Sequence, residues 1–142
     1  MASLAIEAKA KEPFGNKTLQ EWLSASSSES SKTNRLKRWD FIERHLPTVR
    51  EGAYSEIRYQ ILHRCASAVI EAGRFNIGLA AFFVQAFATP EESFEEYSKF
   101  CKLLRIDARR NGCGRAQVGE VQLLVGWADC ELASDEEVAS IA

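Results

Sequence analysis

The segment Leu-Ala-Ala-Phe-Phe-Val-Gln-Ala-Phe, residues 79–87, constrains the fold more than any other part of this 142-residue chain. Eight of its nine side chains are apolar, so the run shows no alternation of apolar and polar residues. A strand of this composition is covered on both faces, which is typical of the central strands of parallel sheets. Parallel strands need long crossover connections, usually helices. The segment therefore predicts an α/β protein with this strand near the centre of its sheet.

Local signals predict the elements around this strand. Thr18, with Glu21 three residues later, forms a capping box and predicts a short helix that contains Leu19, Trp22 and Leu23. The remaining expectations are helices over about 33–45, 54–71 and 90–104, strands over about 4–9 and 118–128, a mobile serine-rich loop over 24–32 and a basic loop over 105–115. Together they predict a small central mixed sheet flanked by helices, in one domain over 1–130 with an acidic tail over 131–142.

Composition narrows the class of protein. The hydrophobic content of 46% suffices for one compact core, and the net charge of −2 excludes polyanion binding by bulk charge alone. No apolar run is long enough to span a membrane, and the start of the chain does not have the order of a signal peptide. The four cysteines form no C-x-x-C pair, which favours reduced thiols over a zinc site with His45 or His63. We therefore expect a cytoplasmic protein without a membrane partner.

Glu7-Ala8-Lys9 is the pattern that most directly suggests chemistry. In a strand, Leu4, Ile6 and Ala8 share one face while Glu7 and Lys9 share the other. One face can then enter a core while the other presents a carboxylate and an amine roughly 7 Å apart along the chain. A carboxylate is a suitable Mg²⁺ ligand, and a nearby lysine can orient a water molecule. An exposed strand with ordinary polar residues is the alternative, because Glu-x-Lys is common by chance.

Two basic segments are candidate binding surfaces. One is the helix that carries Arg35, Lys37 and Arg38. The other is residues 102–115, where five basic side chains stand against the single Asp107, a local balance of +4. Its arginines are Arg105, Arg109, Arg110 and Arg115. Arginine-rich segments suit phosphate groups or acidic protein surfaces, and a solvated polar face is the alternative.

Four short motifs, taken in order, resemble those of a bacterial family of uncharacterised PD-(D/E)xK nuclease-like domains. The first is IEAKAKEPFG over 6–15, and the second is R-Y-Q-x-x-H-R-x-x-x-A over 58–68. The third is E-A-x-R-F over 71–75, and the fourth is VQAF over 84–87. The resemblance covers roughly residues 4–128 and implies a restriction-endonuclease-like core. It implies catalytic roles for Glu7 and Lys9, with Glu7 as metal ligand and Mg²⁺ or Mn²⁺ as cofactor. It also places Gln60 and Arg64, four residues apart on one helix face, in the site.

The chain departs from that family pattern at its start. The pattern requires a strand with a first aspartate before the Glu-x-Lys strand, and residues 1–3 cannot supply it. Glu12 is a candidate substitute for the missing carboxylate, but the sequence does not define where its side chain points. Asp40, Asp107 and Asp129 lie elsewhere in the chain and match no metal-site motif. One strand carboxylate is a poor Mg²⁺ site, so Glu7, Lys9 and Gln60 are expected to be a partial or vestigial site without a bound cofactor. The Glu7 strand should also be a sheet edge, which favours a homodimer or a protein partner.

Three functions follow from these observations. The first is a non-catalytic binding or inhibitor protein on a shortened nuclease fold, with a phage anti-defence (anti-CRISPR) protein that binds a host nucleoprotein complex as one candidate. It includes nucleic-acid contact through the basic helix and loop. The second is a Mg²⁺- or Mn²⁺-dependent DNA endonuclease, completed by dimerisation or by a partner chain. The third is a folded fragment with no activity of its own.

Overall fold

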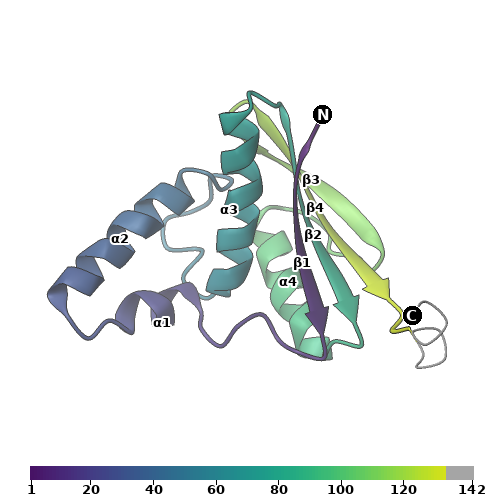
Figure 1. Cartoon of the computed structure of the whole chain (residues 1–142), viewed down its shortest axis with the longest axis horizontal. Helices are drawn as coiled ribbons and strands as arrows, with labels where there is room; N and C mark the ends of the chain where they lie inside the picture. The colour runs from purple at the N-terminus through teal and green to yellow at the C-terminus, as the bar shows by residue number, and fades with distance from the viewer. Residues whose placement is uncertain (134–142) are drawn as a thin grey trace, which may run out of the picture.

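The computed structural model describes residues 1–133 as a four-stranded sheet with helices packed on it (Figure 1). The elements, in chain order, are β1 (Ser3–Ala10), α1 (Leu19–Ser24), α2 (Glu29–Glu43), α3 (Tyr59–Arg74), β2 (Leu79–Phe87), α4 (Glu91–Leu103), β3 (Gly112–Val118) and β4 (Val121–Cys130). The strand order is β1-β2-β4-β3, with β1, β2 and β4 parallel and β3 antiparallel to β4. The predicted mixed sheet flanked by helices is confirmed.

β2 is the central strand, as its composition predicts. Its bounds are those of the apolar run, and it pairs in parallel with β1 on one side and β4 on the other. Ala80, Phe82, Val84 and Ala86 are all buried on one face. The remaining side chains are only partly covered except Ala81, so the two faces of β2 are not equally buried.

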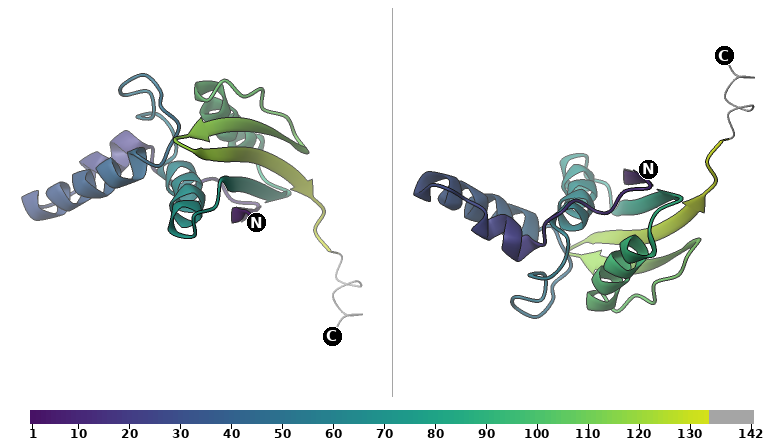
Figure 2. Two further views of the ribbon diagram at one scale, coloured as in Figure 1. Left: turned by 90° about the horizontal axis from the view of Figure 1, so that it is seen from above. Right: turned by 90° about the horizontal axis from the view of Figure 1, so that it is seen from below.

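All four helices lie on one side of the sheet (Figure 2). α3 packs on β1 and β2, while Phe94 and Tyr97 of α4 contact the Trp127 ring of β4, with ring centroids 5.1 and 5.2 Å apart. The buried Leu123, Val125 and Trp127 continue the core on this inner face. The helices α1 and α2 form an arm that extends away from the sheet, beyond α3.

The outer face of the sheet carries apolar side chains that no helix covers. On β1, Leu4 is 56% exposed and Ile6 is 49% exposed. On the central strands, the Phe83 ring lies over Gly126, where a Cβ atom would come within 2.1 Å of the ring. Glu7 and Lys9 are on the inner face and are 7% and 3% exposed. The expectation that Leu4 and Ile6 enter the core, leaving Glu7 and Lys9 on an open face, is therefore wrong.

The helix starts depend on capping and on bonds to neighbouring segments. The Thr18–Glu21 capping box is present, with the Thr18 N–H donating to Glu21 Oε2 at 2.7 Å. The Ser28 hydroxyl caps α2, so the predicted loop over 24–32 is wrong for residues 29–32. α3 begins at Tyr59 instead of Tyr54, because the Ile57 carbonyl accepts a hydrogen bond from Leu19 N–H and Arg58 bridges to Thr18.

A β-hairpin replaces the end of the predicted basic loop. Residues 112–115 belong to β3, and a turn at Gly119 and Glu120 leads into β4. Glycine has a low strand propensity, so Gly112 and Gly114 argued against a strand over these residues in the sequence. Gly114 is needed there because a Cβ atom would come within 2.3 Å of the Ile106 side chain. The glycines let the segment after α4 approach the backbone of β3 closely while β3 pairs with β4.

Two further features concern the helices and the cysteines of the described residues. None of their helices has the length and apolar composition needed to cross a bilayer. Cys65, Cys101, Cys113 and Cys130 are free thiols, and burial raises the pKa of Cys101 to about 11. The predicted acidic residues 135–137 lie outside the described part of the chain.

Gly114→Ala tests this packing. We expect a loss of about 1–3 kcal/mol in the free energy of unfolding, since the new methyl group overlaps Ile106. The double variant Gly114→Ala/Ile106→Val should recover part of the loss in urea denaturation. Gly73→Ala, in α3 with open space around it, is the matched control and should be neutral or stabilising. An unchanged stability in Gly114→Ala would contradict the close contact.

Candidate functional site

Glu7, Lys9, Gln60 and Arg64 converge into one cluster between β1 and α3, here called the Glu7 cluster. Lys9 Nζ is 2.9 Å from Glu7 Oε1 and donates to Gln60 Oε1 at 3.0 Å. Gln60 Nε2 donates to Glu7 Oε1 at 2.7 Å, and Arg64 Nε lies 2.8 Å from Glu7 Oε2. The four side chains that the resemblance assigns to one site thus lie together, with Glu7 and Lys9 buried and the Arg64 side chain half exposed.

The local structure explains the convergence. Glu7 and Lys9 are two residues apart on a strand, and Gln60 and Arg64 are four apart on a helix, so each pair shares a face. The apolar stripe of α3, which includes Ile61 and Cys65, is buried in the core, and its polar stripe meets β1. Polar groups from the helix thus meet polar groups from the strand.

The loop after β1 closes the cluster from another side. Phe14 is 1% exposed and its ring centroid is 5.6 Å from Lys9 Nζ. Gly15 has φ +53°, and a Cβ atom there would lie 3.7 Å from Gln60 Oε1. The positive φ favours glycine at this position, while the 3.7 Å separation is an ordinary contact. The motif EPFG thus supplies the cover of the cluster.

The cluster as it stands does not fit a divalent cation. Both oxygens of Glu7 already accept bonds from Lys9, Gln60 and Arg64, whereas Mg²⁺ and Mn²⁺ require several oxygen ligands. Glu12 reaches Lys9 Nζ at 3.7 Å, but its side chain is 63% exposed. Within residues 1–133, no group of three or more His, Cys, Asp or Glu side chains is placed to hold a metal ion. The observed chemistry is that of a satisfied internal ion pair.

Comparison with known families places the chain. The family described as Domain of unknown function (DUF6946) matches residues 1–132. The chain belongs to this family. Comparisons with curated proteins and with solved structures gave no match.

The basic helix α2 approaches the Glu7 cluster through a row of stacked rings. Arg35 donates to the Trp22 carbonyl and lies over the Trp22 ring, which stacks on Tyr59 with centroids 3.9 Å apart. Tyr59 in turn stacks on His63, one residue before Arg64. Partial burial lowers the pKa of His63, and the charges of Arg64 and Arg38 lower it further. Arg38 therefore lies close enough to α3 to act on His63, and both Arg38 and Lys37 are exposed.

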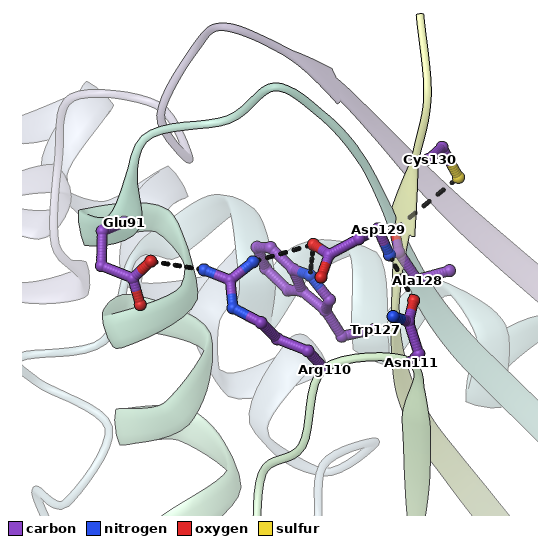
Figure 3. Close-up of polar contacts among 7 residues, drawn as sticks. All are labelled: Glu91, Arg110, Asn111, Trp127, Ala128, Asp129 and Cys130. Carbon is purple, nitrogen blue, oxygen red and sulfur yellow. Dashed lines mark hydrogen bonds and ion pairs between the residues drawn. The ribbon is translucent and has the colours of Figure 1, made fainter.

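Arg110 binds residues of two elements of this chain, α4 and β4 (Figure 3). Its guanidinium is 2.5 Å from Glu91 Oε2 at the start of α4 and 2.8 Å from Asp129 Oδ1 at the end of β4. Asp129 Oδ1 also accepts from the Trp127 indole at 2.8 Å. The guanidinium lies 4.6 Å from the centroid of the Phe94 ring. These contacts tie the 104–111 segment to α4 and β4.

The other predicted binding arginines are spread over the surface. Arg109 pairs with Asp107 at 2.9 Å in an exposed contact. Arg105 and Arg115 are exposed, on the 104–111 segment and on β3. The α2 arm extends away from the sheet (Figure 2), whereas the 104–111 segment connects α4 to β3 of the sheet. Their binding roles remain predictions.

Glu91, Trp127 and Asp129 are the partners of Arg110 that the sequence did not identify. Trp127 and Asp129 are two residues apart on β4, so the strand assignment alone predicts that their side chains share a face. Glu91 lies 19 residues before Arg110 and no spacing rule connects the two. Only the packing of α4 against β4 brings them together.

The pairing of Glu7 with Lys9 is testable by a double-mutant cycle. Glu7→Gln should cost about 3–5 kcal/mol, because it leaves the buried Lys9 ammonium without its carboxylate. Lys9→Met should also destabilise. The double variant should cost clearly less than the sum of the two, since both charges are then absent. Urea denaturation gives all three values, and additive costs would contradict a coupled pair.

Arg110 and Arg109 are adjacent arginines with opposite expectations. Arg110→Ala should destabilise by about 1–2 kcal/mol, because it removes two ion pairs and the contact with the Phe94 ring. Arg109→Ala should change the free energy of unfolding by less than about 0.5 kcal/mol, since its pair with Asp107 is exposed. Thermal and urea unfolding of both variants give the comparison. Equal effects would show that the Arg110 contacts add no stability.

Proposed function

We propose that this chain is a non-catalytic binding protein that takes up a β-strand of a partner protein along the free edge of β1. The observation that carries the proposal is the burial pattern of β1. Its apolar Leu4 and Ile6 are exposed, and its charged Glu7 and Lys9 are buried. The strand thus satisfies its charges internally and offers its apolar side chains outward.

The backbone of β1 supports strand addition. β1 pairs with β2 over its whole length, and within residues 1–133 no strand pairs with its other side. An edge strand presents free N–H and C=O groups that can form a ladder with an incoming strand. Eight residues, Ser3–Ala10, are available for such a ladder. Strand addition uses backbone bonds for affinity and alternate side chains for specificity.

The outer face beside that edge supports an apolar partner strand. Leu4 and Ile6 are followed on the same face by Ala8 and Ala10, all of them exposed. Phe83 and Phe87 of β2 continue this face and are partly exposed. A neighbouring strand whose outward side chains are apolar would cover Leu4 and Ile6 while its backbone pairs with β1. Adjacent exposed apolar residues of this kind mark interaction surfaces.

Position-specific photo-crosslinking in cells tests the proposal. A benzophenone amino acid at Leu4 should capture a partner protein, while the same amino acid at Leu36 of α2 should not. Leu36 is the matched control because it is 47% exposed, close to Leu4 at 56%. In the purified complex, amide hydrogen exchange of residues 3–10 should slow on binding, because a strand ladder protects the β1 amides.

Ile6→Lys supplies the affinity test. It should weaken binding of the captured partner about tenfold or more while leaving the melting temperature unchanged, since Ile6 is exposed in the free chain. Leu36→Lys should leave binding unchanged. If Ile6→Lys binds as well as the wild type, β1 is not the docking edge. A crosslinked product of two copies of this chain would show instead that a homodimer closes the edge.

The class of partner is a separate part of the proposal. We propose a nucleoprotein defence complex of the host cytoplasm as partner, with the chain as a phage or mobile-element inhibitor, because the chain is small and its nuclease-like site is incomplete. The exposed β1 surface supports it, and so do the free thiols, which suit a reducing compartment. Expression of the chain should then restore plating of a phage that the complex restricts. Ile6→Lys should lose this effect and Leu36→Lys should keep it.

A metal-dependent endonuclease is the second candidate. The observation in its favour is that Glu7, Lys9 and Gln60 meet beside the β1 edge, where a partner strand could bring further carboxylates. DNA incubated with the chain and its crosslinked partner, with Mg²⁺ or Mn²⁺, should then be cut. Glu7→Gln should abolish cutting in a protein that still folds by circular dichroism. Intact DNA in all these mixtures would remove this candidate.

A further inference from the structure

A hollow of about 830 Å³ lies away from β1, between the loop 47–53, the end of α4 and β3. The Tyr54 hydroxyl donates to the Pro47 carbonyl at 2.7 Å and holds the start of the loop in place. The turn bonds from Ala53 N–H to the Arg50 carbonyl and from Ser55 N–H to the Gly52 carbonyl fix the rest. The volume is in the range of small-molecule sites.

The lining combines apolar walls with a cationic rim. Apolar residues contributed by the three segments are Pro47, Val49, Ala53, Leu103, Leu104 and Ala116. The charged residues are Arg50, Lys102 and Arg105, and no carboxylate lines the hollow. Within residues 1–133, none of these three cations forms an ion pair with an acidic side chain. Three like charges thus surround an apolar hollow without a counter-charge from the described chain.

The backbone of Arg105 adds a second observation. Arg105 N–H donates to the Lys102 carbonyl and Ile106 N–H donates to the Cys101 carbonyl, the bonding pattern that ends a helix in a Schellman motif. The residue at this position has a left-handed backbone, φ +58°, and glycine is the usual choice. An arginine there costs stability relative to glycine and places a cation at the rim of the hollow.

We propose that this hollow binds a small amphiphilic anion, a molecule with one anionic head group and an aliphatic tail. The head group pairs with Arg50, Lys102 and Arg105, and the tail packs on Val49, Leu103 and Leu104. Both parts are needed, because exposed ion pairs alone contribute little and the apolar walls alone do not select charge. The site is separate from the β1 edge and does not depend on the function proposed there.

Matched ligands test the two halves of the site. Decanoate and decyl phosphate, each kept below its micelle-forming concentration, are titrated into the ¹⁵N-labelled chain and followed by NMR. Amide shifts should concentrate at Val49, Leu104 and Ala116. Decanol, which has the tail without the charge, and acetate and inorganic phosphate, which have the charge without the tail, should each bind at least about tenfold more weakly. The decanoate and decyl phosphate arms together show which head group is preferred.

Arg105→Gly gives a two-sided test in the same chain. Glycine relieves the left-handed backbone, so the melting temperature should rise by about 2–4 °C. Removal of the cation should weaken decanoate or decyl phosphate binding about threefold to fivefold. Arg109→Gln is the control, because Arg109 is nearby but does not line this hollow, and it should bind as the wild type does.

Three results would overturn the proposal. One is equal binding of decanol and decanoate, which would mean that charge plays no part. Another is unchanged affinity in Arg105→Gly. The third is a set of amide shifts centred on Leu4, Ile6 and Phe83, which would place the ligands on the open sheet face and not in the hollow.

Discussion

Glu7 and Lys9 are charges held on the covered side of an edge strand, and the arrangement around β1 depends on how they are neutralised. Burying a charge without a partner is costly, whereas a bonded pair with further hydrogen bonds is tolerated. Here Gln60 bonds to both members of the pair and Arg64 takes the second oxygen of Glu7. α3 can therefore present its polar stripe to β1 and its apolar stripe to the core.

The contacts of Glu7 and Lys9 with Gln60 and Arg64 fix the register of β1 against β2. Glu7 lies opposite Val84 in the parallel ladder, so both point to the helical side. A shift by one residue would turn Leu4 and Ile6 inward and place them against Gln60 and Arg64, leaving those groups without partners. The polar stripe of α3 and the alternation of β1 thus agree on one register. The consequence is an outer face with exposed apolar residues, which is the surface on which we propose that a partner docks.

The basic segments illustrate how tertiary contacts redistribute charge. Arg110 stands in a run with a surplus of positive charge, yet its guanidinium bonds to Glu91 and Asp129 and lies over the Phe94 ring. Arg105, five residues earlier, forms no such bonds within the described chain and lies at the rim of a hollow. Local charge therefore does not distinguish a structural arginine from one that is free to bind. The carboxylates that decide the matter come from α4 and β4.

Local signals predicted much of the framework. The apolar run over 79–87 gave the central strand, and the box formed by Thr18 and Glu21 gave the start of α1. β3 could not be predicted, because Gly112 and Gly114 have low strand propensity. Gly114 is present because of its close contact with Ile106, which only the folded structure shows. α2 extends four residues earlier than its apolar periodicity suggests, because the Ser28 hydroxyl caps it. These misses occur where a side chain from elsewhere, or a cap, overrides propensity.

The sequence by itself determined which side chains share a face: Glu7 with Lys9 on a strand, and Gln60 with Arg64 on a helix. These shared faces follow from the periodicities of the strand and the helix, which do not depend on the rest of the fold. Only the tertiary structure decided which face of β1 the helices cover. A strand is the same local structure whichever side is packed, and the choice depends on the polar stripe of α3, more than fifty residues away along the chain.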